Sequence, residues 1–165
     1  MDRLTYKDSC DIEFKAQNLI ENFLGKISTT VINTSISQKL QTETGDYLFK
    51  YKGKVYSMEL KVEQTNKYGN FFLETWSNLD YNRANPGWMY KIKPDYLFYY
   101  FLDEDMLYVM KFEELFNWAF IDDRLKSFKL KVQKKYSQKN VTAGRVVPIG
   151  VLVKELNLKM FKIKS

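Results

Sequence analysis

Two acidic residues and a lysine lie close together in this sequence, at the two ends of a stretch that is typical of a hairpin. Asp46 opens the stretch, and Glu59, Leu60 and Lys61 follow near its end. Two carboxylates can hold a divalent cation, and a neighbouring lysine can orient or deprotonate a water and stabilise charge on a phosphate. These residue types therefore predict metal-assisted hydrolysis of a phosphodiester bond.

The composition limits the chemistry that this chain can perform. The sequence contains no histidine, which excludes Ser-His-Asp triads, histidine-ligated metal sites and phosphotransfer through histidine. The single Cys10 cannot form an internal disulfide, and no cysteine cluster indicates zinc. The groups that remain favour a hard, oxygen-ligated cation such as Mg²⁺ or Mn²⁺.

The stretch from residue 46 to residue 62 alternates with a period of two and is interrupted by Lys52-Gly53, which predicts a two-residue hairpin turn. Counting back from this turn places Tyr47 opposite Met58 and Asp46 opposite Glu59, with Lys61 further along the same face. Directly opposed side chains have Cβ atoms about 5 Å apart, from which two carboxylates can share a cation. The other face is then predicted to be core, with Tyr47, Phe49, Tyr56, Met58 and Leu60.

Two alternatives to this metal site stay open. The pattern Glu-x-Lys also occurs at Glu13-Phe14-Lys15, so the short motif alone is weak evidence. The hairpin face could also be a solvated charge cluster, although two opposed acids repel each other on a bare surface. A three-residue loop would shift the register and weaken the geometric argument.

The rest of the chain predicts an α/β (α+β) fold. Its 165 residues, 45% apolar, suit a single domain over residues 1–165, with a core over about residues 10–120 and basic C-terminal strands over about residues 124–165. Helices are predicted at residues 11–26 and 113–120, and a polar loop at residues 137–145. Strands are predicted at residues 29–33, 70–77, 95–102, 106–112, 128–136 and 146–153.

The net charge of +6 is divided unevenly along the chain. Residues 124–165 carry twelve Lys and Arg against the single acid Glu155, and residues 1–123 carry fourteen against nineteen acids. A basic segment attached to an acidic body favours a polyanion as partner, although a solvated lysine-rich surface has the same composition. The predicted nucleic-acid-binding residues are Arg83, Trp88, Lys91, Lys93, Lys131, Lys134 and Lys135.

Two tryptophans and one further acid have competing interpretations. Trp88 follows Pro86-Gly87 in a predicted loop and is the candidate for stacking on bases, whereas Trp76 is predicted to pack in the core. Glu74 alternates with aromatic residues on a predicted strand, and it is either a further site acid or a strand-edge charge.

At these residues the sequence resembles the PD-(D/E)xK nuclease superfamily, in particular its small phage and archaeal-resolvase-like members. The resemblance rests on the first helix with Glu13, on Gly45-Asp46 and on Glu59-Leu60-Lys61. It implies a restriction-endonuclease-like core of helix, three-stranded meander, helix and strand, in which flanking helices cover a mixed central sheet. Two departures are that no clear long helix follows Lys61 and that Gly45 replaces the proline of the family's name.

The resemblance also implies roles for individual residues. Asp46, Glu59 and Lys61 would be catalytic, and Mg²⁺ or Mn²⁺ would be bound by Asp46, Glu59 and the backbone carbonyl of Leu60, with Glu13 as an additional acid. The implied activity is a metal-dependent DNA endonuclease. Branched DNA is a candidate substrate, because small members include Holliday junction resolvases, which act as dimers, so a homodimer is a candidate assembly.

Two other functions remain open from the sequence. The chain could be a non-catalytic binding or inhibitor protein on the same scaffold, or a restriction or defence nuclease that needs a partner subunit. The sequence has no signal-peptide pattern and no apolar stretch long enough to cross a bilayer, so a cytoplasmic location without membrane association is expected. Its richness in Lys, Asn, Ile and Tyr suggests an AT-rich genome, such as that of a phage or a low-GC bacterium.

Overall fold

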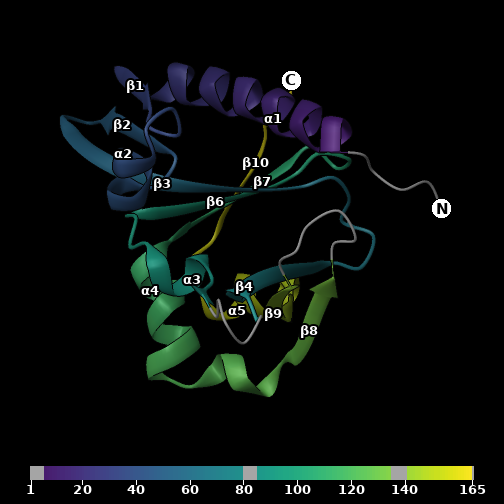
Figure 1. The fold of residues 1–165 in the computed structure, drawn as a ribbon. Coiled ribbons are helices and arrows are strands. Elements are labelled where there is room, and N and C mark those ends of the chain that lie inside the picture. The colour runs from purple at the N-terminus through teal and green to yellow at the C-terminus, as the bar shows by residue number, and fades with distance from the viewer. Residues whose placement is uncertain (1–5, 80–84, 135–140, 165) are drawn as a thin grey trace. The chain divides into compact units, whose positions relative to one another are not determined.

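The computed structural model describes residues 6–79, 85–134 and 141–164, and it is drawn in Figure 1. The chain divides into two compact units, each made of separate stretches of sequence. The first unit contains Met1–Asn66, Pro94–Val109 and Lys159–Ser165, and the second contains Lys67–Lys93 and Met110–Leu158. The predicted single domain over residues 1–165 stays a prediction. The fold class is α+β, as expected from the sequence.

The first unit is built on a mixed six-stranded sheet with the order β1-β2-β3-β6-β7-β10. The pairs β1–β2, β2–β3 and β7–β10 are antiparallel, whereas β3 and β6 are parallel. The strands are β1 (Thr30–Asn33), β2 (Tyr47–Tyr51), β3 (Lys54–Glu63), β6 (Tyr96–Phe101), β7 (Met106–Lys111) and β10 (Lys159–Lys162).

The long helix α1 (Tyr6–Ile27) packs on this sheet through a stripe of apolar residues. Ala16, Ile20 and Leu24 recur every four residues and are fully buried, as expected for one face of a helix. They form one core with the sheet residues Tyr47, Phe49, Met58, Leu60, Phe98, Tyr100, Leu102, Leu107 and Ile163. Burying a large apolar side chain contributes about 1.5–3 kcal/mol, so this core is the main force that fixes α1 on the sheet.

The hairpin between β2 and β3 has the predicted two-residue turn. Lys52 and Gly53 have φ angles of 48° and 79°, which is the left-handed pair that a type I′ turn requires. The register pairs Tyr51 with Lys54, Phe49 with Tyr56 and Tyr47 with Met58, as the sequence predicted. The predicted core face of the hairpin is also confirmed, with Tyr56 partly buried at its edge.

The second unit is built on a four-stranded antiparallel sheet with the order β5-β4-β9-β8. Its strands are β4 (Asn70–Asn78), β5 (Asn85–Pro86), β8 (Lys129–Lys134) and β9 (Val141–Pro148). Its helical elements are short: α3 (Trp88–Lys91), α4 (Phe112–Phe116), the π-helix η1 (Asn117–Ile121), the 3-10 helix η2 (Arg124–Ser127) and α5 (Ile149–Glu155).

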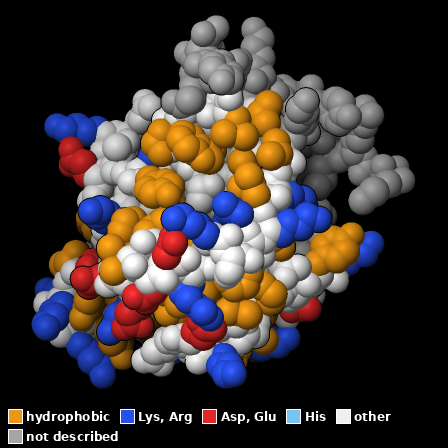
Figure 2. All heavy atoms as spheres, turned by 90° about the horizontal axis from the view of Figure 1, so that it is seen from below, with side chains coloured by type: hydrophobic (Ala, Val, Ile, Leu, Met, Phe, Trp, Pro, Cys, Tyr) orange, Lys and Arg blue, Asp and Glu red, His pale blue; other side chains and the backbone are white. Residues whose placement is uncertain are grey.

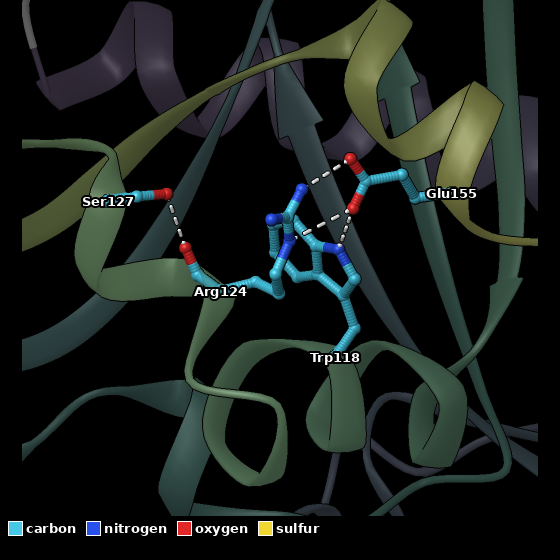
Figure 3. Close-up of polar contacts among 4 residues, drawn as sticks. All are labelled: Trp118, Arg124, Ser127 and Glu155. Carbon is cyan, nitrogen blue, oxygen red and sulfur yellow. Dashed lines mark hydrogen bonds and ion pairs between the residues drawn. The ribbon is translucent and has the colours of Figure 1, made fainter.

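A polar cluster joins three of these short elements, as Figure 3 shows. The Trp118 indole N–H donates to Glu155 Oε2 at 2.7 Å, and Arg124 Nη2 donates to Glu155 Oε1 at 2.6 Å. The Ser127 hydroxyl donates to the Arg124 carbonyl at 2.7 Å. Glu155 therefore connects η1, η2 and α5, and these bonds lower the pKa of its carboxyl, with the Trp118 bond contributing most.

The structure corrects several predicted elements. Residues 146–153 are not one strand, because β9 ends at Pro148 and α5 begins at Ile149. The predicted loop at residues 137–145 is wrong for its last five residues, which lie in β9, and its first four lie outside the described residues. The predicted helix at residues 113–120 is two consecutive helices, α4 and η1.

Five elements were missed by the sequence prediction. These are α2 (Gln38–Thr44), α3, β5, η2 and β10. The sheet prediction was also incomplete, because the strands form a mixed sheet and a separate antiparallel sheet. Within the part of the chain that the structure describes, no helix is long and apolar enough to span a membrane.

Candidate functional site

Asp46 lies just before β2, where the backbone leaves the antiparallel ladder. The last pair of the hairpin ladder is Tyr47 with Met58, and the amide of Asp46 donates to the Met58 carbonyl at 2.8 Å. Asp46 is therefore not in the ladder position opposite Glu59 that the register count predicted. The predicted register is correct for the residues of β2. It fails at Asp46, one residue before β2 begins, where the chain bends.

The Asp46 carboxylate instead reaches the backbone of the tripeptide. The Leu60 amide donates to Asp46 Oδ2 at 2.8 Å, and the Gln41 side-chain amide donates to Asp46 Oδ1 at 2.7 Å. Because the N–H and C=O of one residue point to the same side of a strand, the Leu60 carbonyl faces the same edge as the Asp46 carboxylate. The structure thus brings Asp46 beside the peptide between Glu59 and Lys61.

The backbone around Asp46 is held closely against β3. Gly45 has a φ of 82°, and a Cβ at this position would lie only 2.6 Å from the Met58 carbonyl oxygen, so a glycine is needed there. Thr34, which is fully buried, donates from its hydroxyl to the Gly45 carbonyl at 2.6 Å and from its amide to the Asp46 carbonyl at 2.9 Å. These contacts fix Asp46 independently of its own side chain.

Glu59 and Lys61 lie on the face of β3 that is opposite to the α1 core. Lys61 Nζ donates to Glu59 Oε1 at 2.5 Å, and Glu59 is only 6% exposed. A buried carboxylate without a partner would carry a large desolvation cost, and the ammonium of Lys61 offsets it. The pair thus combines a carboxylate side chain that is 8% exposed with a lysine side chain that is 28% exposed.

Acidic residues of α1 act on Tyr47, the residue that follows Asp46. The Tyr47 hydroxyl donates to Glu21 Oε1 at 3.1 Å, and Asn33 Nδ2 donates to the same oxygen at 3.1 Å. Burial raises the pKa of Tyr47, and the negative charges of Glu21, Asp46 and Glu13 raise it further. The predicted acid Glu13 therefore acts electrostatically on the same tyrosine as Asp46.

Sequence reasoning missed Gln41 and Glu21 in this site. Gln41 lies in α2, which was not predicted, and its contact with Asp46 depends on how that short helix packs. Glu21 lies on the predicted first helix, but nothing in its spacing distinguishes it from a solvated acid.

The predicted nucleic-acid-binding residues have varied positions in the second unit. Lys91, Lys93 and Lys131 are exposed, whereas Trp88 is 9% exposed and its ring lies 6.5 Å from that of Phe112. Burial corrects the prediction that Trp88 stacks on bases, because neighbouring core side chains cover its ring. Arg83, Lys135 and the side chain of Lys134 lie outside the described residues.

Trp76 and Glu74 both lie on β4. Trp76 is 41% exposed, so the prediction that it packs in the core is wrong. Phe71, Leu73 and Thr75 alternate as the buried residues of β4, so Trp76, the next residue, lies on the opposite face of the strand. Glu74 is half-buried and pairs with Gly144, and its role as a site acid stays a prediction.

The donor atoms of the first unit suit a small, hard cation. In the described ranges, no three Asp, Glu or Cys residues are grouped closely enough to hold a metal ion. Mg²⁺ commonly uses only one or two carboxylates and keeps several waters, and it accepts backbone carbonyl oxygens. Asp46, Glu59 and the Leu60 carbonyl are therefore a chemically suitable set for Mg²⁺ or Mn²⁺.

Comparisons of the chain with protein-family models, with curated proteins and with solved structures give no match.

Proposed function

We propose that this protein is a metal-dependent DNA endonuclease of the PD-(D/E)xK type. The observation that carries the proposal is the contact between the Asp46 carboxylate and the Leu60 amide, which brings Asp46 beside the Glu59-Leu60-Lys61 tripeptide. This contact places a carboxylate and a backbone carbonyl on one edge of β3. Asp46 therefore contacts the Glu59-Leu60-Lys61 motif in the folded protein, which the sequence spacing alone did not guarantee.

The order of elements in the first unit supports the same proposal. The resemblance implies a helix, a three-stranded meander, a helix and a further strand, and α1, β1–β3 and β6 follow this order. Where the resemblance implies a helix after the meander, this chain has residues 67–93. These residues belong to the second unit and contain β4, β5 and α3. This departure matches the absence of a long helical pattern after Lys61.

Each residue of the site has a proposed role. Asp46, Glu59 and the Leu60 carbonyl would hold Mg²⁺, which supplies the positive charge that makes hydroxide available near neutral pH. Lys61 would orient the attacking water and stabilise the negative charge that grows on the phosphate. The bond from Lys61 to Glu59 holds the ammonium in place before substrate binds.

Nicking of supercoiled plasmid in Mg²⁺ tests the proposal. We expect the wild-type protein to nick the plasmid, EDTA to abolish nicking, and Asp46→Asn and Lys61→Met each to reduce the rate by at least about a hundredfold. Glu43→Gln is the matched control, because Glu43 is an exposed acid three residues before Asp46. Full activity in either site variant would refute the assignment.

One observation favours a second candidate, a non-catalytic binding protein on the same scaffold. Both oxygens of Asp46 accept hydrogen bonds from protein groups, and Glu59 is paired with Lys61, so these carboxylates are satisfied without a cation. A wild-type protein that neither nicks DNA nor binds Mn²⁺ would support this candidate. A protein that binds Mn²⁺ but is inert alone would instead indicate a nuclease that requires a partner.

A further inference from the structure

A partly exposed group of aromatic side chains lies in the second unit and is separate from the candidate site described above. It consists of Tyr90 on α3 and of Phe116 and Phe120 on the α4–η1 segment, and we call it the aromatic shelf. The Tyr90 and Phe120 rings have centroids 4.5 Å apart at 31°, and the Phe116 and Phe120 centroids are 4.9 Å apart. Tyr90 is 47% exposed although it stacks on Phe120, so much of its surface remains open to solvent.

Two lysines, Lys91 and Lys93, follow Tyr90 in the sequence. Lys93 Nζ lies 5.7 Å from the centroid of the Phe116 ring, within the range of a cation–π contact. Lys91 Nζ donates to the Ser77 hydroxyl at 3.2 Å, which fixes this ammonium beside β4. Open aromatic surface is thus combined with two positive charges on one short segment.

The same part of the second unit also contains several acidic residues. Glu114 is paired with Lys111 at 2.9 Å, and Asp123 is paired with Lys126 at 3.0 Å. Of the two acids of α4, Glu114 is the paired one, and the exposed Glu113 lies one helical turn before Phe116. The two lysines after Tyr90 therefore favour a negatively charged partner near that residue, whereas Glu113 repels such a partner.

We propose that the aromatic shelf binds single-stranded nucleic acid, with an unpaired base stacked on Tyr90 and its flanking phosphates beside Lys91 and Lys93. Unpaired bases offer planar faces that duplex DNA hides, and stacking on aromatic side chains combined with basic residues is how such strands are bound without sequence preference. A purely apolar protein partner would not use the two lysines. The choice of nucleic acid over another polyanion rests on the proposed nuclease function.

Fluorescence anisotropy with a labelled 15-residue oligo(dT), in EDTA and low salt, tests this proposal on the full chain. Tyr90→Leu should weaken binding by about fivefold to a hundredfold, because stacking of a base on an aromatic side chain contributes that much. Tyr90→Phe should retain binding, since it keeps the ring. Glu113→Gln should strengthen binding, and Lys93→Gln should lower the slope of log K against log salt by about 0.7.

Tyr51→Leu is the matched control, because Tyr51 is an exposed tyrosine with Lys52 Nζ 5.2 Å from its ring centroid, but on the hairpin of the first unit. Equal weakening by Tyr51→Leu and Tyr90→Leu, or unchanged binding in a folded Tyr90→Leu protein, would overturn the proposal. The assay contains no metal, so it is separate from catalysis. A protein that binds oligo(dT) through Tyr90 but neither nicks DNA nor binds Mn²⁺ would refute the nuclease and leave the shelf standing.

Discussion

The Asp46 carboxylate is held at both oxygens by groups that come from different elements. Gln41 donates from α2 and the Leu60 amide donates from β3, so the carboxylate has a defined orientation. Such outer contacts matter for a cation site, because they set the direction of the ligand oxygens and are often worth 10-fold to 100-fold in metal affinity. We therefore infer that Gln41 is a positioning residue, which orients the Asp46 carboxylate.

Removing the Gln41 amide tests that role. We expect Gln41→Met, which keeps the length of the side chain but loses its donor, to weaken Mn²⁺ binding by about tenfold. Isothermal titration calorimetry measures the affinity directly. Gln38→Met is the control on the same helix, and equal affinities for wild type and Gln41→Met would contradict the positioning role.

The closeness of Gly45 to β3 predicts a second effect at the residue scale. Gly45→Ala should lower the free energy of unfolding by about 2 kcal/mol or more, because it combines a positive φ with a Cβ that meets the Met58 carbonyl. Gly53→Ala should cost only about 1 kcal/mol, since Gly53 also has a positive φ but nothing within 4 Å. Urea unfolding compares the two, and equal losses would show that the close approach is unimportant.

At the scale of elements, the hairpin was predictable and its surroundings were not. The alternation of residues 46–62 and the Lys52-Gly53 turn are local signals, and they gave the correct register and core face. The contact of Asp46 with Leu60 lies beyond the last pair and depends on Thr34 and Gly45, which no local pattern joins. The sequence therefore indicated the register of the hairpin, but not the contact of Asp46 with the Leu60 amide.

Other elements were mispredicted because tertiary structure overrode local preference. Val151 and Val153 favour a strand, yet these residues form α5, which follows Pro148 and buries Leu152. Pro86 and Gly87 suggested that Trp88 lies in an exposed loop, yet Trp88 begins α3 and is buried. Trp76 is exposed because it lies on the face of β4 opposite to the buried Leu73 and Thr75, as the period of two along the strand already indicates.

The cluster around Glu155 gives a pH prediction for the second unit. Bonds from Trp118 and Arg124 lower the pKa of Glu155 in the folded state, so the stability that it contributes is present above the unfolded pKa of about 4.3 and is lost as the pH falls through the folded value. We expect Glu155→Gln to lower the urea midpoint at pH 6 more than at pH 3. Tryptophan fluorescence follows the transition, and Glu113→Gln is the control; a Glu155→Gln effect that is the same at both pH values would contradict this role.

At the scale of the whole molecule, charge is distributed unevenly between parts of the chain. The residues after Arg124 are strongly basic, and Lys129 and Lys131 are exposed on the edge strand β8. Figure 2 views the molecule from the side of α4 and β8 and shows Lys and Arg side chains interspersed with hydrophobic ones. Asp and Glu side chains also lie on this face.

The charge distribution predicts which lysines determine the salt dependence of DNA binding. Lys129→Gln and Lys131→Gln should each reduce the slope of log K against log salt by about 0.9 on duplex DNA, because each removes about one phosphate contact. Lys39→Gln, in α2 of the first unit, is the control. Filter binding at several salt concentrations measures the slope, and equal slopes for all four proteins would contradict a role for β8.

The central claim is that Asp46 and Glu59 bind one divalent cation together, and Mn²⁺ titration followed by electron paramagnetic resonance tests it most directly. We expect one Mn²⁺ site per chain in the wild-type protein, weakened at least about tenfold in both Asp46→Asn and Glu59→Gln, and unchanged in Glu43→Gln. An Mn²⁺ affinity that is the same in the wild type and in both site variants would show that these two carboxylates do not share a cation.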